Sequence, residues 1–275
     1  MIRCGITGST GSIGSVVIKK ISTFTFIKFE GDISNKNDVE KWIKKNNFDL
    51  ILHFAAIVPI KLVNKNKTKA YNVNFVGTKN IIDSVLKFNQ SLKWFFFSST
   101  SHVYKNKFGK IAENHTTKPK NIYGQTKLKA ENYIKKKLNK SKIKYCIGRI
   151  FSTTSVNQKN NYFVPDIKKK IHESNESLLK FKNLNHYRDF ISPYDISKIL
   201  LLLWKKKYNG TINIASGKSI LLKKIVLSIL KSKNKKNFLF FDNKRVTSLV
   251  ADISKLRKIT GWRGGHSILD MLFKV

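Results

Sequence analysis

The stretch GITGSTGSIG, residues 5–14, constrains the fold more than any other part of the chain. Apolar residues lie on both sides of it, so it predicts a strand, a tight turn and a helix. In such a turn Gly8 permits the bend, Gly11 lets the backbone approach a phosphate closely, and Gly14 lets the helix pack on the strand. The first N–H groups of the helix would bind the anion. The stretch therefore predicts a dinucleotide-binding turn.

Strands and helices alternate through the first half of the sequence. Strands are predicted near 2–7, 24–30, 49–55, 92–99 and 143–150, and helices near 12–21, 36–46, 70–89 and 121–139. This alternation, with apolar strands, favours an α/β fold with a doubly wound parallel sheet of the Rossmann type.

The pattern is looser after residue 150. Helices are predicted near 164–173, 194–205, 219–231 and 266–274, and strands near 178–181 and 211–215. We expect residues 1–150 to form an NAD(P)-binding domain. Residues 151–275 are expected to form a smaller substrate-binding lobe, partly interleaved with the first domain.

The charge is strongly unbalanced, with 54 basic and 16 acidic residues and a net charge of +38. Because the lysines are scattered over many helices, we interpret the charge as compositional bias and expect no specific nucleic-acid partner. A nucleic-acid-associated protein is the competing hypothesis. No apolar run approaches the roughly 18 residues that span a bilayer. Cys4 and Cys146 fall in predicted strands, so buried thiols and a cytoplasmic location are expected.

An acidic residue is expected after the second strand, where it would bind a ribose hydroxyl. The sequence FEGDIS supplies Glu30 and Asp32, and we assign the contact to Asp32. A free carboxylate there would repel a 2′-phosphate. NAD is therefore favoured, with NADP left open.

A second group of residues suits acid–base chemistry. In YGQTK, Tyr123 and Lys127 lie one helical turn apart on one face. An ammonium beside the phenol, together with a nicotinamide ring, would favour the phenolate near neutral pH. The strand FFFSST ends in hydroxyl residues, so Thr100 could donate to a substrate oxygen. The alternative is that YGQTK only begins a helix.

These motifs resemble those of the extended short-chain dehydrogenase/reductases, in the NAD-dependent epimerase/dehydratase family. The resemblance covers nearly the whole chain and rests on TGSTGSIG, GDIS, HFAA, NFVGT, SSTSHVY, YGQTK, RDFISPYDIS and ADISKLRKITGW. It implies hydride transfer at C4 of a nucleotide-activated sugar, in a homodimer that needs no metal.

The resemblance also implies roles for individual residues. Tyr123 would be the acid/base, Lys127 would bind the nicotinamide ribose, and Thr100 would contact the substrate. Arg188 would clamp the substrate diphosphate, and Arg245 would replace an arginine of the late loop. The implied cofactor contacts, besides Tyr123 and Lys127, are Gly8, Thr10, Gly11, Ser12, Ile13, Gly14, Asp32, Ile33, Phe54, Ala55, Ala56 and Asn74.

Departures from the family pattern narrow the chemistry. Ser101 and His102 follow Thr100 where the 4,6-dehydratases have Asp-Glu, so dehydration is not expected. Because STTSVNQKNN offers no second acid/base, 3,5-epimerisation is not expected either. We interpret His102 as a residue that caps the end of the preceding strand. Ser152 follows Phe151 where the family often has Asn. Only one strand fits between the glycine loop and GD, which predicts an open adenosine pocket.

Two enzymatic hypotheses remain. A 4-ketoreductase with a dissociable cofactor is favoured over a 4-epimerase that retains NAD, because an open adenosine pocket suits a cofactor that leaves in each cycle. From another class, a nucleic-acid-associated or cofactor-sensing protein on the same fold is the alternative.

Overall fold

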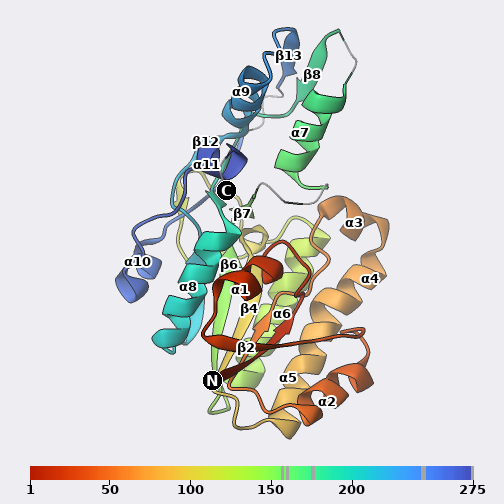
Figure 1. Ribbon diagram of the computed structural model, residues 1–275, viewed down its shortest axis with the longest axis vertical. Helices are drawn as coiled ribbons and strands as arrows, with labels where there is room; N and C mark the ends of the chain where they lie inside the picture. The colour runs from red at the N-terminus through yellow and green to blue at the C-terminus, as the bar shows by residue number, and fades with distance from the viewer. Residues whose placement is uncertain (156–157, 159–160, 175–176, 243–245, 274–275) are drawn as a thin grey trace.

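A six-stranded parallel sheet forms the core of the larger lobe, in the lower half of Figure 1. The computed structural model describes residues 1–155, 158, 161–174, 177–242 and 246–273. The strand order is β11-β6-β4-β3-β1-β2. The strands are β1 (Ile2–Thr7), β2 (Phe24–Lys28), β3 (Leu50–His53), β4 (Trp94–Thr100), β6 (Lys144–Ile150) and β11 (Gly210–Ile214). The predicted doubly wound parallel sheet is confirmed.

Helices cover both faces of this sheet, which explains why β3 and most of β4 are fully buried. One face packs against α1 (Gly14–Lys20), α8 (Pro193–Lys205) and α10 (Ser254–Thr260). The other packs against α2 (Lys36–Lys45), α5 (Gly77–Phe88) and α6 (Ile122–Leu138). Among the described residues, no helix is both long and apolar enough to cross a bilayer.

The sheet ends at β2, which pairs with β1 alone. The prediction of a single strand between the glycine loop and GD is therefore confirmed. From β1 the chain crosses to β2 on one side, and β3 lies on the other side of β1. α1, which follows β1, lies on one face of the sheet, and α5, which follows β3, lies on the other. A crevice opens at the carboxyl ends of the strands, where open α/β sheets bind ligands.

The later residues build a second lobe beyond these carboxyl ends (Figure 1). It contains α7 (Phe163–Glu173), α9 (Leu222–Ser232), α11 (Ile268–Phe273) and the strand pair β8 (Leu179–Lys182) and β13 (Phe238–Phe241). A smaller sheet has the order β12-β9-β14-β5, with β12 (Ile220–Leu221), β9 (His186–Arg188), β14 (Thr247–Ala251) and β5 (Lys110–Ile111). The short strands β7 (Ser152–Thr153) and β10 (Phe190–Ile191) pair separately.

The two halves of the chain exchange strands. The second half supplies β11 to the main sheet, and the first half supplies β5 to the smaller sheet. A division of the chain at residue 150 remains a prediction.

The predicted helix over 70–89 is present, but it begins earlier and contains a π-helical turn. The chain forms α3 (Ile60–Lys65), α4 (Lys67–Tyr71), a π-helical turn at Asn72–Val76, and then α5. Asn66 starts α4 as its N-cap, because its side chain accepts a hydrogen bond from the Lys69 N–H.

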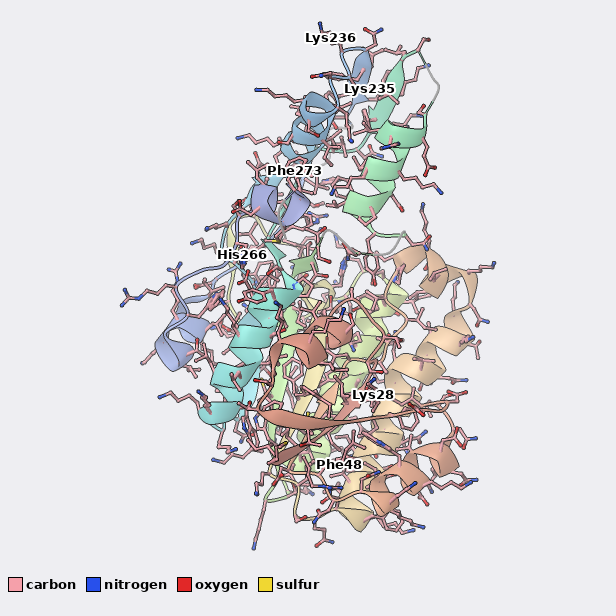
Figure 2. All side chains as sticks on the ribbon, in the orientation of Figure 1. Lys28, Phe48, Lys235, Lys236, His266 and Phe273 are labelled. Carbon is pink, nitrogen blue, oxygen red and sulfur yellow. The ribbon has the colours of Figure 1, made fainter. Side chains whose placement is uncertain are left out.

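The basic side chains are dispersed over the molecule. Lys28 lies on the edge strand of the main sheet, whereas Lys235 and Lys236 lie at the far end of the second lobe (Figure 2). Cys4 and Cys146 are buried free thiols, as predicted, and burial raises the pKa of both.

Candidate active site

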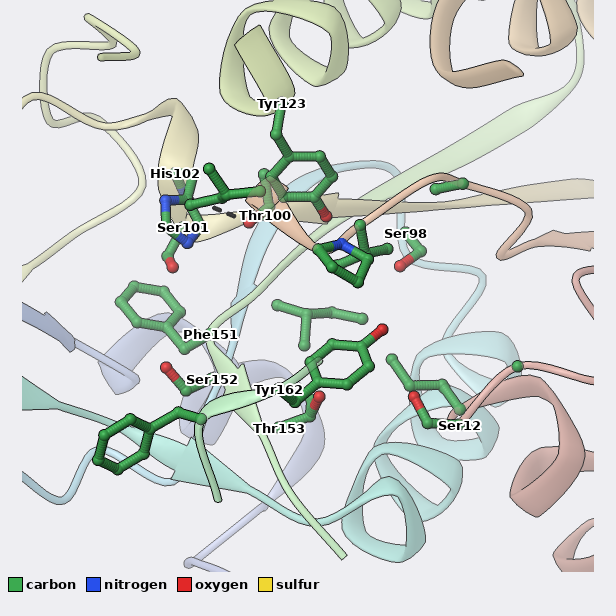
Figure 3. A pocket seen from close by; sticks show the side chains of 18 of the residues that line it. Ser12, Ser98, Thr100, Ser101, His102, Tyr123, Phe151, Ser152, Thr153 and Tyr162 are labelled. Atoms are coloured by element: carbon green, nitrogen blue, oxygen red, sulfur yellow. Dashed lines mark hydrogen bonds between the residues drawn. The ribbon is translucent and has the colours of Figure 1, made fainter. Parts of the chain in front are cut away.

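A cavity of about 490 Å³ lies at the crevice between the main sheet and the second lobe. Its walls come from the glycine loop, the segment after β3, the end of β4, the start of α6 and the segment before α7. The predicted site residues that line it are Gly8, Gly11, Ser12, Ile13, Gly14, Phe54, Ala56, Thr100, Tyr123, Lys127 and Arg188. Figure 3 shows Ser12 across the cavity from Tyr123 and Thr100. The structure thus brings the two predicted motifs to one cavity.

The other predicted residues lie elsewhere. Thr10 is exposed at the tip of the glycine loop, and Ile33 is buried in the core beneath α2 and α5. Asp32 lines a separate hollow of about 370 Å³, together with Lys69. Its carboxylate accepts hydrogen bonds from the Ser34 N–H (2.9 Å) and Oγ (2.7 Å), and these bonds lower its pKa. Arg245 lies outside the described residues.

The glycine loop has the shape of an anion cradle. Gly8 has φ +69°, and a Cβ there would lie 2.7 Å from the backbone N of Ala55. A Cβ at Gly14 would lie 2.3 Å from the Gly8 carbonyl oxygen, whereas one at Gly11 would contact that oxygen at 3.2 Å and nothing else within 4 Å. The first turn of α1 carries no acidic residue and no side-chain cap. These N–H groups and the space above Gly11 fit the pyrophosphate of a dinucleotide.

A buried histidine holds the base of this loop. The ring nitrogens of His53 bond to Thr7 Oγ1 (2.7 Å) and Thr78 Oγ1 (2.9 Å). Thr7 Oγ1 also accepts from the Ala55 N–H at 3.2 Å. Burial holds the pKa of His53 well below its usual value, so the ring is neutral. It joins the ends of β1 and β3 to α5.

Asn74 fixes the wall that follows β3. Its side chain accepts from the Ile57 N–H (2.8 Å) and donates to the Ile57 carbonyl (3.0 Å). The π-helical turn places this amide in the protein interior, where Asn74 is fully buried. Asn74 therefore supports the wall formed by Phe54, Ala55 and Ala56 and does not line the cavity.

The start of α6 brings Tyr123 to Thr100. Asn121 caps the helix by accepting from the Gly124 N–H at 2.8 Å. A Cβ at Gly124 would lie 2.4 Å from the His102 carbonyl oxygen, so only glycine lets α6 begin this close to the turn after β4. Tyr123 and Thr100 therefore line the cavity together.

Burial governs the ionisation of Tyr123 and Lys127. It raises the pKa of Tyr123, and the Thr100 side chain opposes this effect. That Lys127 and a nicotinamide ring together favour the phenolate remains a prediction. Lys127 is 1% exposed, and burial lowers its pKa to about 7. Desolvation is the largest cause of both shifts.

A buried ion pair lies behind these residues and was not predicted. Glu131 accepts from Arg149 Nη2 (2.7 Å) and Nε (3.1 Å), and also from the Ser99 hydroxyl. Ser99 precedes Thr100, and Glu131 lies one turn after Lys127 on α6. The four-residue spacing from Lys127 is the one sequence signal that could have found Glu131.

Two further contacts complete the cavity. Arg188 donates to the Tyr187 carbonyl (2.7 Å) and to Thr247 Oγ1 (3.1 Å), which fixes its guanidinium on the β9–β14 pair. Tyr162, the N-cap residue of α7, lines the same cavity as Ser12 of the glycine loop. No sequence pattern indicated Tyr162, because the two residues lie far apart in the chain.

These features agree with the comparisons to known proteins. Residues 4–215 match the NAD dependent epimerase/dehydratase family, and the chain belongs to this family. It is 27% identical over 287 residues to GDP-6-deoxy-D-talose 4-dehydrogenase of Aggregatibacter actinomycetemcomitans, covering 98% of this chain and 96% of that relative. It is 25% identical to UDP-glucose 4-epimerase of Lactobacillus helveticus, covering 88% of this chain and 80% of that relative.

Solved structures share the fold. UDP-glucose 4-epimerase of Thermotoga maritima, in complex with UDP-glucose, superposes with a TM-score of 0.87 at 18% identity, over 98% of this chain and 96% of that one. RMD from Pseudomonas aeruginosa, in complex with NADPH, superposes with a TM-score of 0.87 at 16% identity, over 99% and 96%.

Proposed function

We propose that this protein is an NAD(P)-dependent 4-ketoreductase that acts on a nucleotide-activated sugar. The observation that carries the proposal is the single cavity that joins the glycine cradle to Thr100, Tyr123 and Lys127, with Arg188 in its wall. The end of the cavity at the glycine loop would hold a dinucleotide, and the end at Thr100 and Tyr123 would hold a sugar. The relatives named above are enzymes of nucleotide-sugar chemistry, which supports this substrate class.

The cofactor would lie along the glycine loop, with its pyrophosphate over Gly11 and the start of α1. Phe54 and Ala56 would form one wall, and Lys127 would hold the nicotinamide ribose. Asp32 and Ile33 would lie toward the adenine, at the edge of the sheet. When bound, the nicotinamide exchanges a hydride with the sugar.

The protein's own residues would handle the proton at the C4 oxygen. Tyr123 would give its phenolic proton to that oxygen during reduction, and Thr100 would donate a second hydrogen bond to it. The positive charge of Lys127 would favour the phenolate that results. Because burial raises the pKa of Tyr123, the tyrosine begins the cycle protonated, as an acid for a ketone must.

Arg188 would bind the diphosphate of the substrate, since its planar fork of donors matches phosphate oxygens. Arg245 remains proposed for the same substrate. A homodimer and a cytoplasmic location belong to this proposal as well.

Two observations favour the reductase. Ser101 and His102 follow Thr100, so no carboxylate occupies the positions that dehydration would use. The main sheet ends at β2, so the adenosine of the cofactor would bind at an open edge of the sheet. An open adenosine site suits a cofactor that is exchanged in each cycle. A 4-epimerase that retains NAD is the second candidate, favoured by the relative of that name in Lactobacillus helveticus.

The test combines cofactor analysis with a substrate panel. Mass spectrometry of the purified protein should find an empty dinucleotide site, whereas bound NAD would favour the epimerase. The protein is then incubated with nucleotide-linked 4-keto and 4-hydroxy hexoses, with NADH or NADPH, and oxidation and product isomers are measured separately.

Tyr123→Phe provides the variant for this assay. It should lower turnover by roughly 10²–10⁴-fold while cofactor affinity stays near the parent value, because it removes only the proton donor. Parent-like turnover by Tyr123→Phe would contradict the assignment of the acid.

A further inference from the structure

His102 lies at the catalytic end of the cavity and has no role in the chemistry described above. It lines the cavity wall, and its ring meets that of Tyr123 edge to face, with centroids 5.9 Å apart. Figure 3 shows it beside Thr100. The expectation that its side chain caps the strand end is wrong, because the imidazole bonds to Asn121.

The hydrogen bonds of Asn121 determine which nitrogen of His102 carries the proton. Asn121 Oδ1 accepts from the Gly124 N–H as the N-cap of α6. This fixes the orientation of the amide, so its NH₂ group is the part that faces His102 Nδ1, at 3.2 Å. An amide NH₂ only donates, and Nδ1 must therefore accept. The proton of the neutral ring lies on Nε2.

Within the part of the chain that the structure describes, the ionisable groups facing this imidazole are Tyr123 on α6 and Arg188 on β9. Burial, together with repulsion from Arg188, lowers the pKa of His102 to about 4. A protonated ring would also direct its Nδ1–H at the Asn121 NH₂. The ring is neutral at neutral pH, and its Nε2–H has no hydrogen-bond partner among the described residues.

We propose that His102 is a fixed, neutral hydrogen-bond donor that recognises an oxygen of the substrate sugar next to the one held by Thr100 and Tyr123. The inference rests on the proposed function and adds a specificity residue to it. The ligand it selects is a hexose with a hydroxyl or carbonyl oxygen beside C4. His102 donates through Nε2 and moves no proton, so it is distinct from an acid/base.

The first experiment removes the donor and keeps the ring. His102→Phe should lower kcat/KM on the nucleotide-linked 4-keto hexose by about tenfold, the effect of one neutral hydrogen bond. His102→Gln, which restores an N–H donor, should recover most of this loss. NADH affinity should not change in either variant. His172→Ala, which removes an exposed histidine at the end of α7, is the matched control and should behave like the parent.

Substrate analogues test the contact itself. On a sugar lacking the recognised oxygen, the parent and His102→Phe should have the same kcat/KM, because no contact remains to be lost. Equal kcat/KM values on the complete sugar would overturn the proposal. So would a pH profile in which His102→Gln loses an ionisation that the parent shows between about pH 5 and 8, since that would make His102 an acid/base.

Asn121→Asp tests the tautomer without a substrate. Aspartate still caps α6, but its carboxylate would accept from Nδ1–H and move the neutral ring's proton off Nε2. In ¹⁵N-histidine spectra at pH 7.5, the parent should show His102 protonated at Nε2. The variant should show Nδ1 protonated, with a higher His102 pKa.

The NMR experiment separates the two possible failures. Protonation of Nδ1 in the parent overturns the donor role, whatever the enzyme acts on. A parent that turns over no sugar of the panel overturns the proposed function, while the NMR result still decides the state of His102.

Discussion

Gly11 and Gly14 lie three residues apart in one loop, but side chains at the two positions would meet different obstacles. A Cβ at Gly11 contacts one carbonyl oxygen at 3.2 Å, whereas one at Gly14 would lie 2.3 Å from it. Gly11→Val should therefore fold and lose dinucleotide binding. Gly14→Ala should lose roughly 1–3 kcal/mol of stability through overpacking. Thermal unfolding and NADH fluorescence titration measure the two effects, and parent-like NADH affinity in Gly11→Val would contradict the cradle.

Glu131 gives a second prediction at this scale. Glu131→Gln keeps a hydrogen-bonding group toward Ser99 but leaves the Arg149 charge buried without its partner. We expect the free energy of unfolding to fall by about 3–5 kcal/mol. Glu40→Gln is the control, since Glu40 pairs with Lys36 and Lys44 at 3.7 and 4.0 Å on the surface of α2 and should change stability by less than about 1 kcal/mol. Equal effects in urea denaturation would show that the buried pair contributes little.

Among the elements, the π-helical turn at Asn72–Val76 interrupts what would be a regular helix. π-helical turns often occur at functional sites, and this one directs Asn74 at the backbone of Ile57. Asn74→Ala should cost about 1–3 kcal/mol, because a buried N–H and C=O lose their partner. It should also weaken NADH binding by loosening the wall after β3. Asn72→Ala, at an exposed position of the same turn, should match the parent in both measurements.

Elements formed by long apolar runs could be predicted from the sequence, because burial on two faces leaves a clear pattern. All six strands of the main sheet agree with prediction to within about two residues, the usual uncertainty of element ends. Strands of two residues, such as β5 and β12, carry no periodicity. The helix predicted over 70–89 is present, but its π-helical turn at Asn72–Val76 was not predicted.

The candidate active site likewise contains features that the local sequence predicts and features that it does not. The glycine loop and the Tyr123–Lys127 pair are local patterns, and the structure places both at one cavity. The contacts behind them join segments far apart in the chain, such as Glu131 with Arg149. The raised pKa of Tyr123 also depends on burial, which the local sequence does not report.

For the whole molecule, the charge of +38 leads to a prediction about nucleic acids. Because the lysines are spread over both lobes, binding should be weak, independent of sequence and steeply lost with salt. Fluorescence anisotropy with two unrelated DNA duplexes, at about 50 and 200 mM salt, should give equal affinities that fall together. A complex that prefers one sequence and survives at the higher salt would favour a nucleic-acid function.

The exchange of strands between the halves of the chain has a consequence for synthesis on the ribosome. When residue 150 has been made, β6 is still the open edge of an unfinished sheet, because β11 closes it only at residues 210–214. β5 remains unpaired for longer, until its partner strand β14 at residues 247–251 has been made. At about 5–20 residues per second, the edge of β6 stays open for on the order of 3–12 s. During that time an apolar strand edge is available to neighbouring chains, and the native pairing of both strands is reached only after residue 251 has been made.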